Sequence, residues 1–189
     1  MMSRRLLCLL ALPLCAACSA PPVQHYAAGR PRFDLAAYFT GTVDAWGMFQ
    51  QRDGEVVKRF TVVIEGRRER DTLVLDERFA YSDGTTQQRV WTLVQAADGR
   101  WHGTADDVVG EAVGESAGNA FNWRYTLRLP VGGRSYEVAF DDWMFQMDDE
   151  TLLNRARMSK FGIDLGEVTL FFRKRAGGDH ARRDESALS

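Results

Sequence analysis

Residues 121–143 read FNWRYTLRLPVGGRSYEVAFDDW, and this stretch decides which fold class the sequence predicts. From Phe121 to Leu129, large apolar side chains alternate with polar ones. Such period-two alternation is typical of an antiparallel strand with one buried face. Gly132 and Gly133 interrupt the pattern, and glycines suit a tight hairpin because they adopt positive φ at low steric cost. We therefore predict two long strands joined by a glycine turn.

The return strand carries an acidic residue on its apolar face. The apolar members of that face are Tyr136, Val138, Phe140 and Met144. Asp142 lies among them, and the register set by a two-residue turn places it beside Trp123 or Phe121. The sequence thus predicts a carboxylate inside the domain, among aromatic side chains.

The chain begins with the pattern of an export signal. Residues 1–17 have a short basic region at Arg4 and Arg5, then an apolar run that is too short to span a bilayer, then small residues before Cys18. This order resembles a bacterial lipobox, with Cys15 where leucine is usual. We expect processing to leave a lipid-modified Cys18 at the new N-terminus, although an ordinary signal peptide is the alternative. By resemblance to sorting in enteric bacteria, a serine at position 19 favours a periplasm-facing lipoprotein in the outer membrane of a Gram-negative bacterium.

Composition limits the partners of the mature chain. The three cysteines, Cys8, Cys15 and Cys18, all lie in the N-terminal segment, so we expect no disulfide and no thiolate metal site in the domain. Without residues 1–17 the chain has 22 basic and 26 acidic residues, a charge of −4, which argues against nucleic acid as a partner. Residues 18–31 read as a tether, and residues 176–189 read as a polar, disordered tail.

The remaining residues, 32–175, repeat the strand pattern of the hairpin. About ten short strands follow one another at 8–12-residue spacing with glycine turns between them, which indicates a sandwich or a barrel. Because every connection reads as a hairpin, we predict one all-β, antiparallel, up-and-down barrel. A short helical turn at 33–39, capped by Asp34, is expected to plug one end.

Two features of the sequence allow either a purely structural or a functional interpretation. The loop Ser82–Gly84 sets Glu77 opposite Arg89 and Leu75 opposite Trp91; the charged pair is either internal or a weak salt bridge at the rim. The Gly- and Ala-rich stretch 108–120 is either a barrel corner or a place where small residues leave room for a ligand.

The domain resembles a family of uncharacterised proteobacterial lipoproteins that contain a domain of unknown function. The resemblance covers residues 32–174, through the segments FDLAAYFTGTVDAWGMFQ, FTVVIEG, LDERFAYSDG, RVWTL, GTADDVVGEAVGESAGNAFNWRY, FDDWM and LLNRARMSKFGIDLGEVTLFF. It implies a lipocalin-like barrel and no particular activity. The Gly-x-Trp signature of the first lipocalin strand is absent, since Gly41 and Trp46 are five residues apart.

The domain offers few groups for catalysis. His25 and His180 lie outside it, and His102 is expected on an outer strand face, so we expect no histidine metal site and no cofactor. Glu77 and Asp142 fall on inward faces, where burial raises the pKa of a carboxyl and suits it to acid–base work. The alternative is that Arg89 neutralises Glu77 and that a backbone donor or a Trp N–H satisfies Asp142. A calcium site at Asp106–Asp107 or Asp141–Asp142 would need a bulge.

Three hypotheses for function follow. The leading one is a binding module in which the barrel holds an apolar or lipid-like ligand. The second is a scaffold that binds another envelope protein through an exposed face. The third is an enzyme that modifies a lipid or glycan through Glu77 and Asp142. The residues expected to line a ligand site inside the barrel are Trp46, Glu77, Arg89, Trp91, Trp123, Tyr125, Asp142, Met144 and Asn154.

Overall fold

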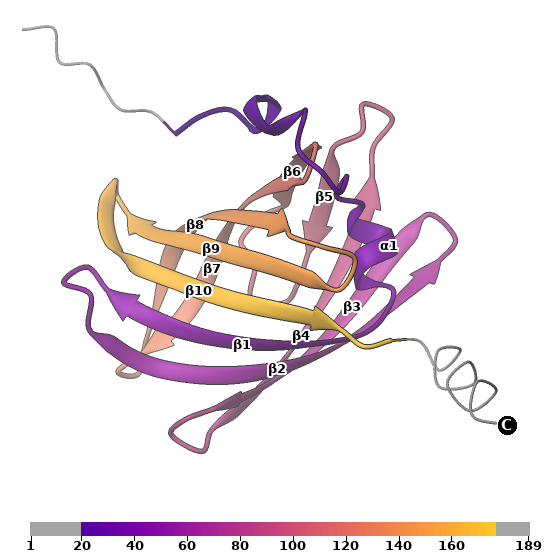
Figure 1. Cartoon of the computed structure of the whole chain (residues 1–189). Helices are drawn as coiled ribbons and strands as arrows, with labels where there is room; N and C mark the ends of the chain where they lie inside the picture. Colours follow the sequence, from indigo (N-terminus) through magenta and orange to yellow (C-terminus); the bar gives the residue numbers. More distant parts are fainter. Residues whose placement is uncertain (1–19, 177–189) are drawn as a thin grey trace, which may run out of the picture.

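The computed structural model describes residues 20–176 and shows a closed barrel of ten antiparallel strands (Figure 1). The expected signal peptide, Cys18 and residues 177–189 of the expected tail lie outside the described residues. Each strand pairs with its neighbours in the chain, and β1 pairs with β10 to close the barrel. This confirms the predicted all-β, up-and-down, lipocalin-like architecture. The strands are β1 (Gly41–Gln51), β2 (Val56–Glu69), β3 (Thr72–Tyr81), β4 (Thr86–Gln95), β5 (Trp101–Thr104), β6 (Ala112–Ala117), β7 (Ala120–Val131), β8 (Arg134–Gln146), β9 (Thr151–Lys160) and β10 (Ile163–Lys174).

The hairpin registers follow the turn chemistry. Gly132 and Gly133, between β7 and β8, have φ values of 57° and 76°, and this turn sets Trp123 opposite Asp142. The loop between β3 and β4 sets Glu77 opposite Arg89 in the same way. Both predicted registers are therefore confirmed. In each case a short turn with a left-handed glycine determines which side chains meet across the pair.

A short helix closes one end of the barrel. α1 (Leu35–Phe39) begins after Asp34, whose carboxylate accepts a hydrogen bond from the Ala37 N–H at 2.9 Å. Phe39 and Leu35 are buried and face the interior. A side chain at Gly66 of β2 would collide with the Phe39 carbonyl, so the absence of a Cβ there lets the helix lie across the barrel end. No helix within residues 20–176 has the length and apolar character needed to span a bilayer.

The segment before α1 is packed against the barrel. Part of the stretch that we expected to be a tether forms a 3-10 helix, η1 (Val23–Tyr26), which lies against β6 and β7. Val23 is buried, and the Tyr26 ring packs edge-on against Trp143 and Phe145 of β8. The Gly29 N–H donates to the Tyr26 carbonyl at 2.8 Å and closes this turn. The N-terminal segment is thus attached to the barrel wall from Val23 onward.

Gly114 in the Gly- and Ala-rich stretch, and Gly103 before it, make room for aromatic rings of the core. A Cβ at Gly114 of β6 would overlap the rings of Phe121 and Trp123, and a Cβ at Gly103 of β5 would overlap Trp123 and Leu93. Phe121 and Trp123 are both buried. The space that the small residues leave is therefore taken by the protein's own side chains, and neither a ligand nor a bend is needed to explain these two glycines.

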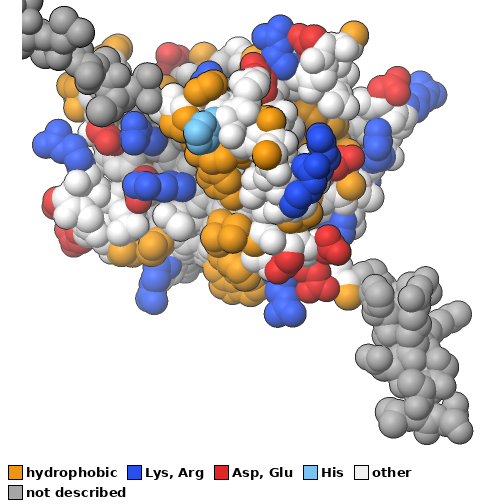
Figure 2. Space-filling model, turned by 45° about the horizontal axis from the view of Figure 1, so that its top comes forward, with side chains coloured by type: hydrophobic (Ala, Val, Ile, Leu, Met, Phe, Trp, Pro, Cys, Tyr) orange, Lys and Arg blue, Asp and Glu red, His pale blue; other side chains and the backbone are white. Residues whose placement is uncertain are grey.

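One outer face of the barrel carries an apolar row. Phe145 of β8 is the register partner of Leu153 of β9; Leu153 pairs with Phe171 of β10, and Phe171 pairs with Trp46 of β1. We refer to Phe145, Leu153, Phe171 and Trp46 as the outer apolar row. Leu153, Phe171 and Trp46 are exposed. Figure 2 shows hydrophobic side chains gathered in a stripe on the face that carries η1, with charged side chains beside it.

Candidate functional site

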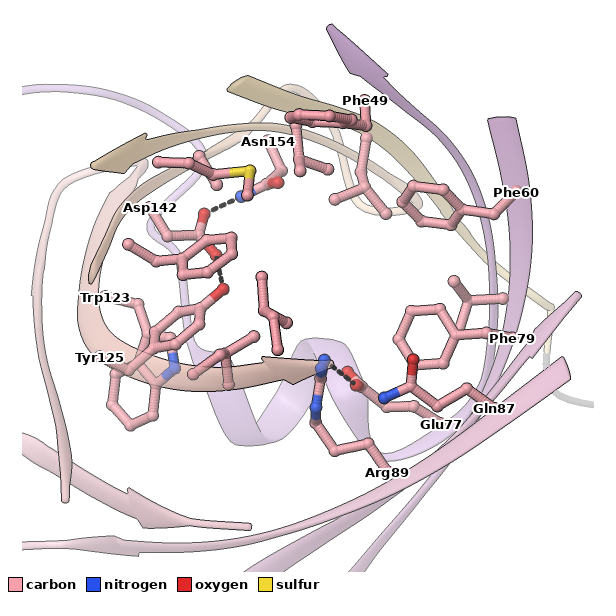
Figure 3. Close-up of a pocket in the computed structure, with 18 of the residues that line it drawn as sticks. Phe49, Phe60, Glu77, Phe79, Gln87, Arg89, Trp123, Tyr125, Asp142 and Asn154 are labelled. Atoms are coloured by element: carbon pink, nitrogen blue, oxygen red, sulfur yellow. Dashed lines mark hydrogen bonds and ion pairs between the residues drawn. The ribbon is translucent and has the colours of Figure 1, made fainter. Parts of the chain in front are cut away.

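The barrel encloses a cavity of about 950 Å³. Its wall consists mainly of aromatic and aliphatic side chains from the inward faces of the strands, with Leu35 and Phe39 at the end that α1 closes. Figure 3 shows Phe49, Phe60 and Phe79 on one side of this space. The wall also reaches the hairpin ends opposite α1, at Val131 and Lys160. We refer to that end as the mouth.

Eight of the nine predicted interior residues line this cavity. They are Glu77, Arg89, Trp91, Trp123, Tyr125, Asp142, Met144 and Asn154. The prediction for Trp46 is wrong, because its side chain lies on the outer face with 48% of its surface exposed, tilted against Phe171. β1 carries one large aromatic on each face, Trp46 outward and Phe49 inward, and Gly47 gives no sign of which face is buried. Alternation alone therefore did not fix the orientation of this strand.

An ion-pair cluster occupies one side of the cavity. Arg89 of β4 lies with its Nη1 3.5 Å from Glu77 Oε2, on the neighbouring strand β3. The same guanidinium binds Asp107 with two nitrogens, Nε to Oδ1 at 2.9 Å and Nη2 to Oδ2 at 2.7 Å. All three side chains are largely shielded from solvent, so the internal interpretation of the Glu77–Arg89 pair holds and the rim interpretation does not. Asp107 comes from the loop between β5 and β6, and no local sequence signal placed it next to Arg89.

Burial dominates the electrostatics of this cluster. Desolvation raises the pKa of Glu77 to about 7, although the nearby charge of Arg89 and a hydrogen bond from Trp91 act in the opposite direction. Burial disfavours the charged form of Arg89, but the hydrogen bonds to Asp107 and the charge of Glu77 hold its pKa above the ordinary value. Arg89 therefore stays cationic, and its charge is already matched by two carboxyl groups.

A second polar cluster surrounds Asp142. The Asn154 amide donates to Asp142 Oδ1, and the Tyr125 hydroxyl donates to Oδ2 at 3.3 Å (Figure 3). We expected a Trp N–H or a backbone donor; the hydrogen bonds come instead from side chains on β7 and β9. Burial raises the pKa of Asp142 to about 7, against the effect of these two donors. The pKa of Tyr125 is also raised, by burial and then by the Asp142 charge, so the phenol remains a donor.

Asn154 leaves one polar atom without a partner. The side chain is 3% exposed, and its NH₂ group donates to Asp142 and, at 3.3 Å, to the Trp143 carbonyl. Its carbonyl oxygen, Oδ1, has no hydrogen-bond partner among the described residues. In Figure 3 this oxygen points away from Asp142, and less than 1 Å² of its surface is accessible. A buried, unpaired acceptor is unfavourable, so the Asn154 side chain is held here by its two donated hydrogen bonds and by packing.

The other candidate groups lie elsewhere. His102 faces outward, as predicted, and its Nδ1 is 2.7 Å from Glu111 Oε2. Across residues 20–176, no three His, Cys, Asp or Glu side chains come together in a way that could hold a metal ion. The titratable groups that face the cavity with clearly raised carboxyl pKa values are thus Glu77 and Asp142, and the acid–base chemistry available to a ligand centres on them.

Comparison with solved structures supports the fold. An S-type phycobiliprotein lyase from Guillardia theta superposes with a TM-score of 0.54 at 6% identity, covering 83% of this chain and all of that chain. A protein of unknown function from the DUF3598 family of Nostoc punctiforme gives 0.48 at 10% identity, with 79% and 51% of the two chains covered. A designed fluorescence-activating β-barrel gives 0.41 at 15% identity, with 76% and 99% covered. The first of these, at 6% identity, shows similarity of fold alone, and the other two, with TM-scores below 0.5, carry no argument.

Comparison of the sequence itself identifies the family. No curated protein matches the chain. Residues 12–174, which include every strand of the barrel, match a family described as "Protein of unknown function (DUF3833)". Because this match extends over most of the 189 residues, the chain belongs to the DUF3833 family.

Proposed function

We propose that this protein binds an apolar, lipid-like molecule inside the barrel. The cavity of about 950 Å³ carries the proposal, because its volume lies within the roughly 300–1,000 Å³ of small-molecule sites. Its wall is mainly aromatic and aliphatic with a few convergent polar groups, which is the usual composition of such sites. Cores of folded domains pack at crystal-like density with few voids, so an interior space of this size is typical of a ligand-binding protein.

The mouth provides a route for the ligand. Leu129 and Val131 of β7 and Leu165 of β10 extend the apolar wall to the hairpin ends, where Val131 is exposed. α1 closes the opposite end with Leu35 and Phe39. An apolar molecule would therefore enter between the hairpin turns and advance toward the helix.

Native mass spectrometry of the protein purified from cell envelopes tests this proposal. The expected result is extra mass that denaturation releases and that lipid analysis assigns to an apolar compound. The apo protein should also take up such a compound from a total lipid extract. A clean apo mass together with no uptake would contradict the proposal.

We further propose that a lipid on Cys18 anchors the barrel to the outer membrane, facing the periplasm. The support is the lipobox-like sequence at residues 15–18. Only four residues separate Cys18 from Val23, which is buried against the barrel wall, so the anchor would hold the barrel close to the membrane. Cys18→Ser should move the protein from the membrane fraction to the soluble periplasmic fraction. Unchanged fractionation would contradict lipidation.

A second candidate function is docking of another envelope protein on the outer apolar row. Exposed Trp46, Leu153 and Phe171 lie on adjacent strands, and a contiguous apolar surface is a common feature of interaction sites. Cross-linking in cells to a defined partner should be lost on Trp46→Glu and retained on Val90→Glu, a matched change at an exposed position of β4. Equal cross-linking of both variants would exclude this surface.

A third candidate is catalysis by Glu77 and Asp142. Both carboxyls face one cavity with a pKa of about 7, the range in which a side chain can both take up and release a proton. The likeness to a phycobiliprotein lyase is compatible with a catalytic barrel. Glu77→Gln and Asp142→Asn should then abolish turnover of the bound compound while its binding persists. A bound compound recovered unchanged from wild type would exclude this candidate.

A further inference from the structure

The polar groups inside the cavity indicate what kind of head group the ligand carries, an inference that rests on the proposed binding function. The side-chain donors that reach the Asp142 carboxyl are already used. The NH₂ of Asn154 donates to Asp142 and to the Trp143 carbonyl, and the Tyr125 hydroxyl donates to Asp142. What the Asp142 carboxyl offers to a ligand in the cavity is therefore acceptor capacity, through its free lone pairs.

The charge balance on the other side of the cavity agrees with this. Arg89 is cationic, but it faces Glu77 at 3.5 Å and holds Asp107 in a two-nitrogen contact at 2.7–2.9 Å. Gln87 is also occupied, because its oxygen accepts from Tyr81 at 2.8 Å and its amide donates to Asp107 at 3.4 Å. The interior therefore presents no uncommitted cation, and with its carboxyls ionised it is negative.

Cations that could meet an anionic head group lie at the mouth. Lys58 and Lys160 both line the outer part of the cavity. Lys58 pairs with Asp83 at 2.9 Å, and Lys160 lies over the Tyr136 ring at 4.7 Å. A carboxylate ligand would thus keep its head at the mouth, whereas a ligand with a hydrogen-bond donor can place its head against Asp142.

We propose that the ligand is a long-chain amphipath whose head group is a neutral hydrogen-bond donor of the hydroxyl type, held inside the barrel by the Asp142 carboxyl. One hydroxyl donates one hydrogen bond, here to Asp142. It needs no donor from Tyr125 or Asn154, which already donate to Asp142. The chain of the molecule then fills the aromatic space toward the mouth. A free carboxylate of the same chain length is excluded from this position by repulsion from Asp142 and Glu77.

The test compares ligands of one chain length on the delipidated full chain. Hexadecanol and hexadecanoate are titrated at pH 8.5 against a bound apolar fluorophore, well below their aggregation limits. The alcohol is expected to bind at least tenfold more tightly, because a hydrogen bond to a charged, buried acceptor is worth about a factor of ten or more. In Asp142→Asn the preference should fall to less than threefold, since the repulsion of the acid is removed. Met144→Leu, a neighbouring wall residue without a hydrogen-bonding group of comparable strength, should keep the wild-type preference.

The outcomes separate this inference from the proposed function. Equal or tighter binding of hexadecanoate by the wild type, lost on Lys58→Gln plus Lys160→Gln, would overturn the head-group assignment and leave the binding function standing. Failure of every chain compound and of the fluorophore to bind would overturn both. An alcohol preference that Asp142→Asn leaves intact would overturn the role of the Asp142–Asn154 cluster. Melting curves of each variant at pH 8.5 show that the protein is folded, and the wild-type comparison needs no variant at all.

Discussion

Glu77 and Arg89 are direct partners across β3 and β4, and the guanidinium that lies 3.5 Å from Glu77 also holds Asp107 at 2.7 Å. One buried cation thus serves two carboxyls that come from a strand and from a distant loop. Removing one partner of a buried charge pair is strongly destabilising, because the remaining charge has no compensation. The same contact helps to hold the loop between β5 and β6 on the barrel, together with its backbone hydrogen bonds to β7.

Arg89→Met should lower the free energy of unfolding by about 3 kcal/mol at pH 8. The loss should be smaller at pH 5, where Glu77 is protonated in the folded state. Arg78→Met is the matched control, since Arg78 pairs with Asp76 at 2.9 Å on the solvent side of the same strand region and its loss should cost less than about 1 kcal/mol. Urea unfolding at both pH values measures this, and equal losses for the two variants would refute the structural role of Arg89.

The buried carboxyls predict how stability depends on pH. Glu77 and Asp142 have folded-state pKa values of about 7 against ordinary values of 4.5 and 3.8, so the folded protein binds more protons than the unfolded chain between these limits. Each group adds on the order of 3 kcal/mol to the free energy of unfolding. This stabilisation is fully present below about pH 4 and is lost as pH rises through 7. Glu77→Gln and Asp142→Asn should each flatten the fall in stability between pH 5 and pH 8. Urea titrations of the wild type and both variants across this range give the slopes, and parallel slopes would contradict raised pKa values.

Two glycines on inward strand faces should differ in their tolerance of a methyl group. Gly114→Ala would press on the rings of Phe121 and Trp123, and Phe121 is only 1% exposed, so its ring has little room to shift. Gly47→Ala would press on Phe60, which lies at the cavity wall and can turn into the open space. We expect a loss of about 2 kcal/mol for Gly114→Ala and less than about 1 kcal/mol for Gly47→Ala. Thermal melts compare the two, and the reverse order would show that the cavity is not open near Phe60.

Filling the cavity should abolish ligand uptake. Ala156 of β9 is buried and lines the cavity, so Ala156→Phe would place a ring in the space that the ligand needs. Ala139→Phe is the control, because Ala139 faces solvent on the neighbouring strand β8. We expect uptake of an apolar fluorophore to weaken more than tenfold for the first variant and to stay unchanged for the second. Unchanged uptake by a folded Ala156→Phe protein would place the binding site outside the barrel.

The sequence determined the features that depend on neighbouring segments of the chain. Alternating apolar residues specified the strands, and glycines with positive φ at the turns specified the hairpins. Each turn then fixed the register of its own pair, which is why the Glu77–Arg89 and Trp123–Asp142 pairings could be predicted without a structure. A short turn leaves few registers open, and a one-residue slip would move every side chain to the wrong face.

The tertiary structure decided what depends on closure and on distant segments. Whether the interior is filled or open depends on the barrel's diameter and on how the inward side chains pack, and alternation specifies neither. Asp107 reaches Arg89 through a loop whose path no local pattern encodes. Asn154 of β9 meets Asp142 only because β9 pairs with β8 in the closed sheet. Trp46 lies outside because closure between β1 and β10 sets the face of a strand that carries an aromatic on each side. Local alternation and turn chemistry act over a few residues, whereas the cavity and its polar groups exist only once all ten strands have closed.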